Sequence, residues 1–182
     1  LEDALGRYSE FLKLSLPKKI NFKNIKVVLD CANGATYIVA PNIFWELGCD
    51  VVTIENQPDG KNINKNCGAI NTKKLSKKVL ESKADIGLAF DGDGDRLIVV
   101  DEKGKEIDGD NIIALLAKDL LILNKLKDKT VVTTIMSNFG FENYLKEELN
   151  INLIRTDVGD INVIQELNKN NYSLGGEQSG HI

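Results

Sequence analysis

The chain has 182 residues, 42% of them hydrophobic and 27% charged, which is an ordinary composition for a soluble globular protein. Its net charge of -4 gives no reason to expect nucleic acid or an anionic membrane as a partner. No apolar run approaches membrane-spanning length, and the three widely spaced cysteines form no C-x-x-C pair, so we expect free thiols in a reducing, cytoplasmic compartment.

Strands and helices are predicted to alternate along the first part of the chain. The hydrophobic pattern predicts helices over residues 3–14, 36–47 and 73–82, and strands over residues 26–30, 50–55, 85–90 and 97–100. The strand over 85–90 leads into an acidic loop, residues 91–96, and the strand over 97–100 returns from it.

The second part of the chain repeats this plan. Helices are predicted over residues 111–123, 139–149 and 161–168, with Asp110 as the N-cap of the first, and strands over residues 130–135, 152–156 and 172–174. Such alternation favours helices layered on mostly parallel sheets. We therefore expect an α/β fold of two similar α/β/α sandwich domains with mostly parallel mixed sheets, over residues 1–107 and 108–182.

The acidic loop reads D-G-D-G-D-R and contains Asp91, Asp93, Asp95 and Arg96. Three carboxylates this close repel one another unless a positive charge lies among them, and the glycines let the backbone turn them toward one point. Oxygen ligands suit a hard cation, so the loop predicts a Mg²⁺ site, with Arg96 placed to bind a phosphate. The plainer alternatives are a solvated acidic turn and an ion pair between Arg96 and its aspartate neighbours.

A calcium loop of the EF-hand kind is the nearest competitor, because Glu102 falls on its twelfth position. However, the sixth position requires glycine and is Arg96 here, and the flanking segments are predicted strands rather than helices. His181 is the only histidine, which argues against histidine-based metal ligation and against a Ser-His-Asp triad.

A glycine-rich segment, the C-terminal loop of residues 175–181, contains Glu177, Ser179 and His181. These side chains offer hydrogen-bonding groups suited to sugar hydroxyls, whereas the alternative is a flexible, solvated chain end. In α/β sheets, ligands bind at the carboxyl ends of strands. Both the acidic loop and the C-terminal loop follow predicted strands, so we expect them to line one cleft.

Two further segments are open to both a structural and a functional interpretation. Residues 30–35 form a strand-to-helix turn, which either lines a site or serves only the fold. Residues 57–72 form a long polar loop, and loops of this length are either functional or loose.

The acidic loop and the G-E-Q-S-G-H stretch of the C-terminal loop together resemble the magnesium loop and the sugar-specificity loop of the α-D-phosphohexomutase family. Segments 30–35, 58–64, 67–68 and 136–138 match the family as well, and the resemblance runs from Gly6 to the end. It implies the second domain and a truncated third domain of a four-domain enzyme. Where the family has K-V-G-D-R-Y, residues 157–162 read D-V-G-D-I-N and lack both basic residues.

The resemblance implies a bacterial isomerase that interconverts glucosamine 6-phosphate and glucosamine 1-phosphate for the synthesis of UDP-N-acetylglucosamine and the cell wall. A phosphoserine on a missing domain would transfer the phosphoryl group, with Mg²⁺ on Asp91, Asp93 and Asp95. Arg96 would offset phosphate charge, and Glu177, Ser179 and His181 would bind the sugar. The chain alone would be inactive. The alternatives are a related mutase acting on mannose or glucose phosphates, or a non-catalytic domain pair.

Overall fold

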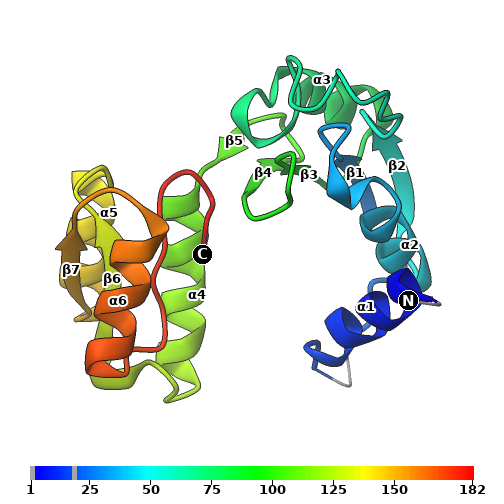
Figure 1. Cartoon of the computed structure of the whole chain (residues 1–182). Coiled ribbons are helices and arrows are strands. Elements are labelled where there is room, and N and C mark those ends of the chain that lie inside the picture. The colour runs from blue at the N-terminus through cyan, green and yellow to red at the C-terminus, as the bar shows by residue number, and fades with distance from the viewer. Residues whose placement is uncertain (1–2, 18–19) are drawn as a thin grey trace. The chain divides into compact units, whose positions relative to one another are not determined.

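A computed structural model of the chain describes residues 3–17 and 20–182. The chain forms two compact units, Leu1–Glu106 and Ile107–Ile182, and each is described by itself below (Figure 1). Within the described ranges, no helix is long and apolar enough to cross a membrane.

A five-stranded mixed sheet forms the centre of the first unit, in the order β2-β1-β3-β4-β5. The strands are β1 (Lys26–Asp30), β2 (Asp50–Ile54), β3 (Ile86–Phe90), β4 (Leu97–Asp101) and β5 (Glu106–Ile107). β1 pairs in parallel with both β2 and β3, and β4 returns antiparallel to β3. The carboxyl ends of the three parallel strands therefore meet at one edge, where β3 runs into the acidic loop.

Helices cover both faces of this sheet, because side chains on each strand alternate between the faces. Val27 and Leu29 of β1 pack into the cluster that includes Ala40 of α2 (Val39–Glu46). Val28 packs instead into the cluster that contains Leu75 of α3 (Lys73–Ser82). Burying each such valine or leucine contributes about 1.5–3 kcal/mol, so both helix layers are held by apolar packing.

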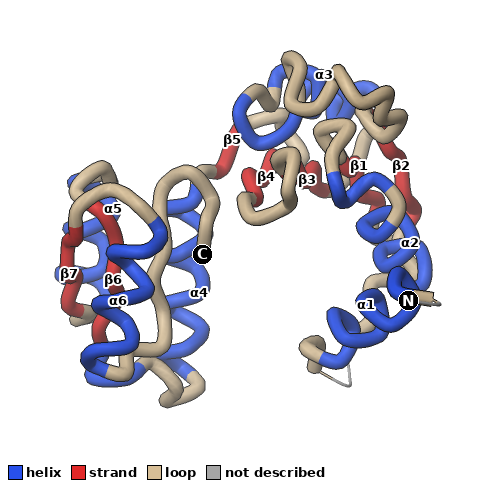
Figure 2. Tube along the Cα trace, in the orientation of Figure 1, coloured by secondary structure: helices blue, strands red, loops and turns tan. Residues whose placement is uncertain are grey.

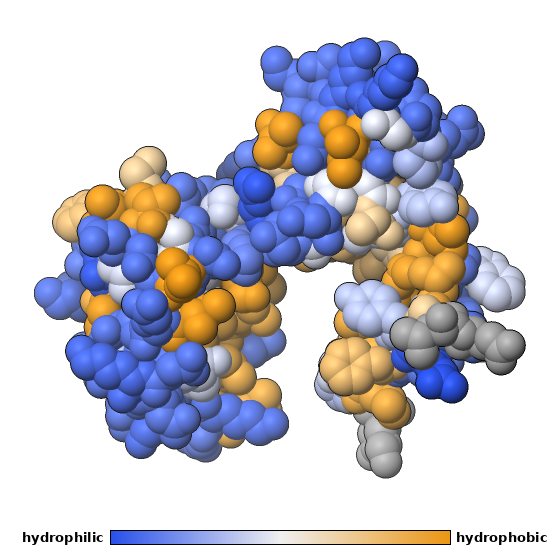
Figure 3. All heavy atoms as spheres, viewed as in Figure 1, coloured by the Kyte–Doolittle hydropathy of each residue, from blue (hydrophilic) through white to orange (hydrophobic). Residues whose placement is uncertain are grey.

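The first helix, α1 (Ala4–Leu14), adds little to this core. Its N-cap, Asp3, accepts a hydrogen bond from the Gly6 amide, and among its own residues only Ser9 is buried. Large apolar side chains of α1, including Phe11, are exposed on the surface, as the apolar atoms around α1 and α2 in Figure 3 show. Lys13 forms an ion pair with Glu46 of α2 at 2.5 Å, which ties α1 to the first unit.

The second unit contains two parallel strands, β6 (Thr130–Thr134) and β7 (Asn152–Thr156), between helices (Figure 2). The helices are α4 (Gly109–Ile122), α5 (Phe139–Asn143) and α6 (Asp160–Asn170). The core joins α4 and α5 to one face of the strands, while α6 lies on the other face (Figure 1). This core contains Ile113, Ala117, Leu126, Val131, Phe141, Leu145, Ile151 and Leu174.

The prediction of one helix over residues 36–47 was wrong in its first turn. Residues Ala35–Tyr37 form a 3₁₀ turn, and α2 starts only at Val39. Pro41 explains the late start, because proline lacks an amide hydrogen and is tolerated in the first turn of an α-helix but not in its interior.

The prediction that Asp110 is an N-cap was also wrong. α4 begins two residues earlier than expected, and the Asp108 side chain caps it by accepting a hydrogen bond from the Asn111 amide at 3.0 Å. Asp110 instead lies inside the first turn and is only 3% exposed. Its carboxylate therefore accepts hydrogen bonds from another part of the second unit instead of capping the helix.

The predicted strand over 172–174 is not formed. One isolated bridge, between Val132 and Gly175, brings this segment beside β6. The Ser173 hydroxyl donates to the Lys125 carbonyl and accepts from the Lys127 amide, so this residue serves the preceding loop rather than a strand ladder. The predicted helix over 139–149 is also divided, since α5 passes into a π-helical turn over Tyr144–Glu148.

Candidate metal and ligand loops

Asp91 is the residue around which the acidic loop folds. Its side chain is 1% exposed, and Oδ1 accepts hydrogen bonds from the amides of Gly94, at 3.2 Å, and Arg96, at 3.1 Å. Oδ2 accepts a third hydrogen bond from Nε of Arg96 at 2.9 Å. A buried carboxylate thus fixes both the backbone of the loop and the Arg96 side chain.

The pKa of Asp91 lies below its ordinary value. Burial alone would raise this pKa, but the hydrogen bonds from the loop and the positive charge of Arg96 outweigh that effect. Asp91 is therefore ionised at neutral pH, as a metal ligand must be.

The three aspartates fit a single hard cation. One oxygen from each of Asp91, Asp93 and Asp95 lies within 4.8 Å of the other two, and Asp93 and Asp95 are exposed to solvent. Although Arg96 occupies Oδ2 of Asp91, a carboxylate oxygen has about two lone-pair positions, so it can accept a further partner. An all-oxygen set of this kind suits Mg²⁺.

Arg96 forms the ion pair that the sequence left open as an alternative. Its Nε lies 2.9 Å from Oδ2 of Asp91 and 3.7 Å from Oδ1 of Asp95. The side chain is 40% exposed, so part of the guanidinium faces solvent. Its binding of a phosphate stays a prediction.

The turn over residues 30–35 packs directly on the acidic loop. The Ala35 amide donates to the carbonyl of Gly92 at 2.8 Å, and a Cβ at Gly34 would lie only 2.2 Å from that carbonyl oxygen. The long polar loop joins the same assembly, since the Asn64 amide donates to the Ala32 carbonyl at 2.9 Å. Only glycine at position 34 permits this close approach, so these segments support the acidic loop.

The C-terminal loop of the second unit is closed by backbone hydrogen bonds. The Glu177 amide donates to the His181 carbonyl at 2.8 Å, and the Gly180 amide donates to the Glu177 carbonyl at 3.0 Å. The first residue of α4 also contributes, because the Gly109 amide donates to the Gln178 carbonyl at 3.0 Å. The loop therefore has a defined shape, in which the side chains of Glu177, Ser179 and His181 are half-buried.

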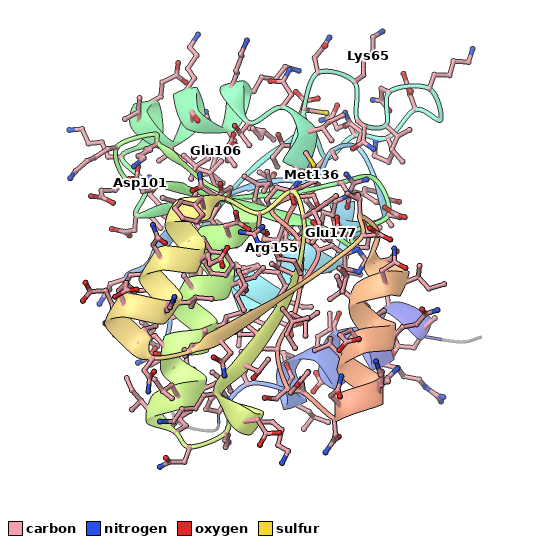
Figure 4. All side chains as sticks on the ribbon, turned by 90° about the vertical axis from the view of Figure 1, so that its left-hand side faces the viewer. Lys65, Asp101, Glu106, Met136, Arg155 and Glu177 are labelled. Carbon is pink, nitrogen blue, oxygen red and sulfur yellow. The ribbon has the colours of Figure 1, made fainter. Side chains whose placement is uncertain are left out.

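The Glu177 side chain is turned toward the start of α6. Its Oε1 accepts a hydrogen bond from the amide of Gly159, the N-cap residue of that helix, at 3.1 Å. Figure 4 shows Glu177 at the same end of the second unit as Met136 and Arg155, which is the carboxyl end of β6 and β7. The carboxylate thus lies where ligands bind in folds of this class.

Two residues at this end of the unit were missed as site residues by the sequence reasoning. Arg155 of β7 donates to Oε2 of Glu142, at 3.1 Å from Nε and 2.8 Å from Nη2, and to the Ser137 carbonyl at 2.9 Å from Nη1. Asp110 accepts hydrogen bonds from the Ser137 hydroxyl, at 2.8 Å, and the Asn138 amide, at 2.7 Å. The single sequence signal for Arg155 was a charge within an otherwise uncharged strand.

Comparison with known families accounts for both units. The family model for phosphoglucomutase/phosphomannomutase α/β/α domain II matches residues 6–104, and the model for domain III matches residues 108–182. The chain belongs to the phosphoglucomutase/phosphomannomutase family. The acidic loop lies in the domain II match and the C-terminal loop in the domain III match, so both loops are parts of family domains.

Curated relatives match this chain along all of its 182 residues. It is 55% identical over 182 residues to the phosphoglucosamine mutase of Thermodesulfovibrio yellowstonii, covering 100% of this chain and 40% of that protein. The phosphoglucosamine mutase of Zymomonas mobilis is 50% identical over 182 residues, again with 100% of this chain and 41% of that protein covered. The chain thus spans about two fifths of the length of the curated relatives that it matches.

Solved structures agree with the fold of this family member. A phosphoglucomutase/phosphomannomutase family protein from Burkholderia thailandensis superimposes with a TM-score of 0.83 at 27% identity, over 98% of this chain and 38% of that one. The Aspergillus fumigatus N-acetylphosphoglucosamine mutase, solved with GlcNAc-6P and magnesium, has a TM-score of 0.66 at 23% identity, over 90% of this chain and 36% of that one. The second likeness supports the fold alone.

Proposed function

We propose that this chain supplies domain II, residues 1–107, and domain III, residues 108–182, of a phosphoglucosamine mutase. The complete protein would interconvert glucosamine 6-phosphate and glucosamine 1-phosphate. The observation that carries this proposal is the match of all 182 residues to phosphoglucosamine mutases at 55% and 50% identity. The matched relatives are longer than this chain, which leaves room for a phosphoserine on another domain.

We propose that Asp91, Asp93 and Asp95 hold Mg²⁺ in the complete protein. The proximity of their three oxygen atoms and the lowered pKa of Asp91 support this. When bound, the ion would supply positive charge to the phosphoryl group during its transfer. The role of Arg96 is to keep Asp91 ionised and oriented, and its exposed part would offset charge on the phosphosugar.

We propose that the C-terminal loop binds the sugar. Glu177, Ser179 and His181 offer a carboxylate, a hydroxyl and an imidazole from one closed loop, which suits the hydroxyl and amino groups of an aminosugar. The phosphoryl group would pass from the phosphoserine to a sugar oxygen, and the other phosphoryl group of the resulting bisphosphate would return to the serine. The phosphate content of the protein would be unchanged after each turnover.

The test compares the complete protein with this chain alone, in Mg²⁺ with glucosamine 1,6-bisphosphate as activator. We expect turnover of glucosamine 6-phosphate by the complete protein, and none by the chain, because positioning and charge stabilisation must come from all domains. The substrates mannose 6-phosphate and glucose 6-phosphate serve as controls. A clear preference for one of them, or turnover by the chain alone, would contradict the proposal.

A further inference from the structure

We propose that Asp110, Ser137 and Thr133 are positioning residues for the C-terminal loop and thereby for recognition of the sugar. The inference rests on the proposed function for the identity of the ligand, but its structural basis is independent. A continuous series of buried polar side chains leads from the first turn of α4, across the end of β6, to the peptide that precedes Glu177.

The series begins with a carboxylate that has been removed from water. Asp110 is 3% exposed, and its two oxygens accept hydrogen bonds from the Ser137 hydroxyl and the Asn138 amide, at 2.8 and 2.7 Å. The partners of these oxygens both belong to the turn that follows β6. Because a buried charge without such partners is costly, Asp110 holds this turn in one position.

Thr133 connects that turn to the C-terminal loop. It is fully buried at the carboxyl end of β6, its Oγ1 lies against Oγ of Ser137, and it donates a hydrogen bond to the carbonyl of Gly176 at 2.9 Å. That carbonyl belongs to the peptide bond between Gly176 and Glu177. Each hydroxyl has one proton, which Ser137 gives to Asp110 and Thr133 gives to Gly176, so the two hydroxyl oxygens meet by close contact alone. The position of the Glu177 backbone is therefore coupled to Asp110 by a hydrogen bond at each end of this pair and by packing between them.

A second contact with α4 acts on the same loop. Gly109, which directly precedes Asp110, donates its amide to the Gln178 carbonyl at 3.0 Å. The first turn of α4 thus holds the loop at residue 178 directly and at residue 176 through the polar series. Apolar side chains would fill the space around Thr133 equally well, but they would leave the Gly176 carbonyl without this hydrogen bond.

The experiment removes single hydroxyl groups from the complete protein. Thr133→Val keeps the size and shape of the side chain and deletes the hydroxyl that touches the loop. Thr134→Val is the matched control, because Thr134 is the next residue of β6 and is equally buried. Within the described residues, the Thr134 hydroxyl takes part in one hydrogen bond, which it accepts from the Met136 amide and not from the C-terminal loop. Thr133→Ser restores the hydroxyl, and Ser137→Ala tests the series independently should Thr133→Val fold poorly.

Two measurements are made on each variant: amide hydrogen exchange across residues 176–180, and kcat and KM for glucosamine 6-phosphate and glucose 6-phosphate. Loss of the hydrogen bond in Thr133→Val should raise KM for glucosamine 6-phosphate roughly three- to tenfold and accelerate exchange in the loop, with little change in kcat. The preference for the aminosugar should fall. Thr133→Ser should recover most of the loss, and Thr134→Val should match the wild type in both measurements.

The outcomes separate this inference from the proposed function. If Thr133→Val and Ser137→Ala exchange and bind substrate as Thr134→Val does, the positioning role is wrong. Faster loop exchange with unchanged KM and sugar preference also overturns it. If the wild-type complete protein does not turn over glucosamine 6-phosphate, the proposed function fails, while faster exchange confined to Thr133→Val and Ser137→Ala still supports the anchoring of the loop.

Discussion

Oε1 of Glu177 lies 3.1 Å from the backbone nitrogen of Gly159, which donates a hydrogen bond to it. Gly159 is the N-cap of α6, where exposed amides and the helix dipole favour a negative charge. Residues 157–162 contain no basic side chain, and a backbone amide is the contact that this segment offers to Glu177. The carboxylate is therefore held in one orientation by the chain itself.

Glu177→Ala should weaken sugar recognition in the complete protein. A lost hydrogen bond to a charged group costs on the order of 1.5–3 kcal/mol, which is roughly a tenfold or larger fall in kcat/KM. Steady-state kinetics with glucosamine 6-phosphate measure this fall in kcat/KM. The control is Glu148→Ala, because Glu148 is an exposed glutamate of the same unit. Unchanged kcat/KM and sugar preference in Glu177→Ala would show that this loop does not select the sugar.

Asp93→Asn should weaken cation binding by the acidic loop. Removing a charged ligand should cost at least the roughly tenfold loss in affinity that is typical of changes around a metal site. Mn²⁺ serves as a spectroscopic probe in a titration followed by electron paramagnetic resonance. Glu102→Gln is the matched control, since this exposed residue holds the last ligand position only in a calcium loop of the EF-hand kind. An equal loss in both variants would favour the calcium interpretation.

Gly109→Ala should displace the C-terminal loop and destabilise the second unit. The added Cβ would lie 2.1 Å from the Glu177 carbonyl oxygen and 2.8 Å from the Gly180 nitrogen, and backbone atoms in a closed loop cannot move aside cheaply. Overpacking of this kind typically costs about 1–3 kcal/mol in the free energy of unfolding. Urea denaturation measures the change.

Gly140→Ala is the control for that measurement. Its Cβ would meet only the end of the Asn138 side chain, at 3.0 Å, and alanine favours the helical conformation of α5. We expect a smaller change than in Gly109→Ala. Equal stability of the two variants would mean that the C-terminal loop does not need the close approach at Gly109.

Stability should fall in alkaline solution because of two buried thiols. Burial raises the pKa of Cys31 and of Cys67 to about 11. Thiols of the unfolded chain ionise near pH 8.5, so from about pH 8.5 to 11 the unfolded state binds fewer protons than the folded state and is increasingly favoured. Below that window the contribution is fully present. Urea denaturation at pH 8 and pH 10 should show a smaller alkaline loss in Cys31→Ala and Cys67→Ala than in the wild type.

The sequence predicted regular elements well where one strong periodicity ran without interruption. β1, β7 and α3 have the bounds that their apolar patterns predict, because such segments bury one face or both. One of the errors falls where contacts from elsewhere in the chain decide the structure. The segment 172–174 is apolar enough for a strand, yet its serine is used by the loop around Lys125 and Lys127.

For the candidate sites too, the sequence predicted some features and only the fold decided others. The sequence by itself determined the acidic loop, since alternating aspartate and glycine after an apolar strand has few stable conformations without a cation or an arginine among the carboxylates. Only the tertiary structure decided that Asp91 is the buried member and that Arg96 binds it. The local D-G-D-G-D pattern presents the three aspartates alike, although in the fold Asp91 is buried and Asp93 and Asp95 are exposed.

The second unit shows the limit of local information most clearly. Glycine and polar residues made the C-terminal loop a candidate from its sequence, but the groups that hold it lie far away along the chain. The hydrogen bonds from Ser137 to Asp110 and from Thr133 to the carbonyl of Gly176 join residues 27 and 43 positions apart. Contacts at such separations leave no periodic trace in the sequence, because they depend on where α4 and β6 come together in the fold.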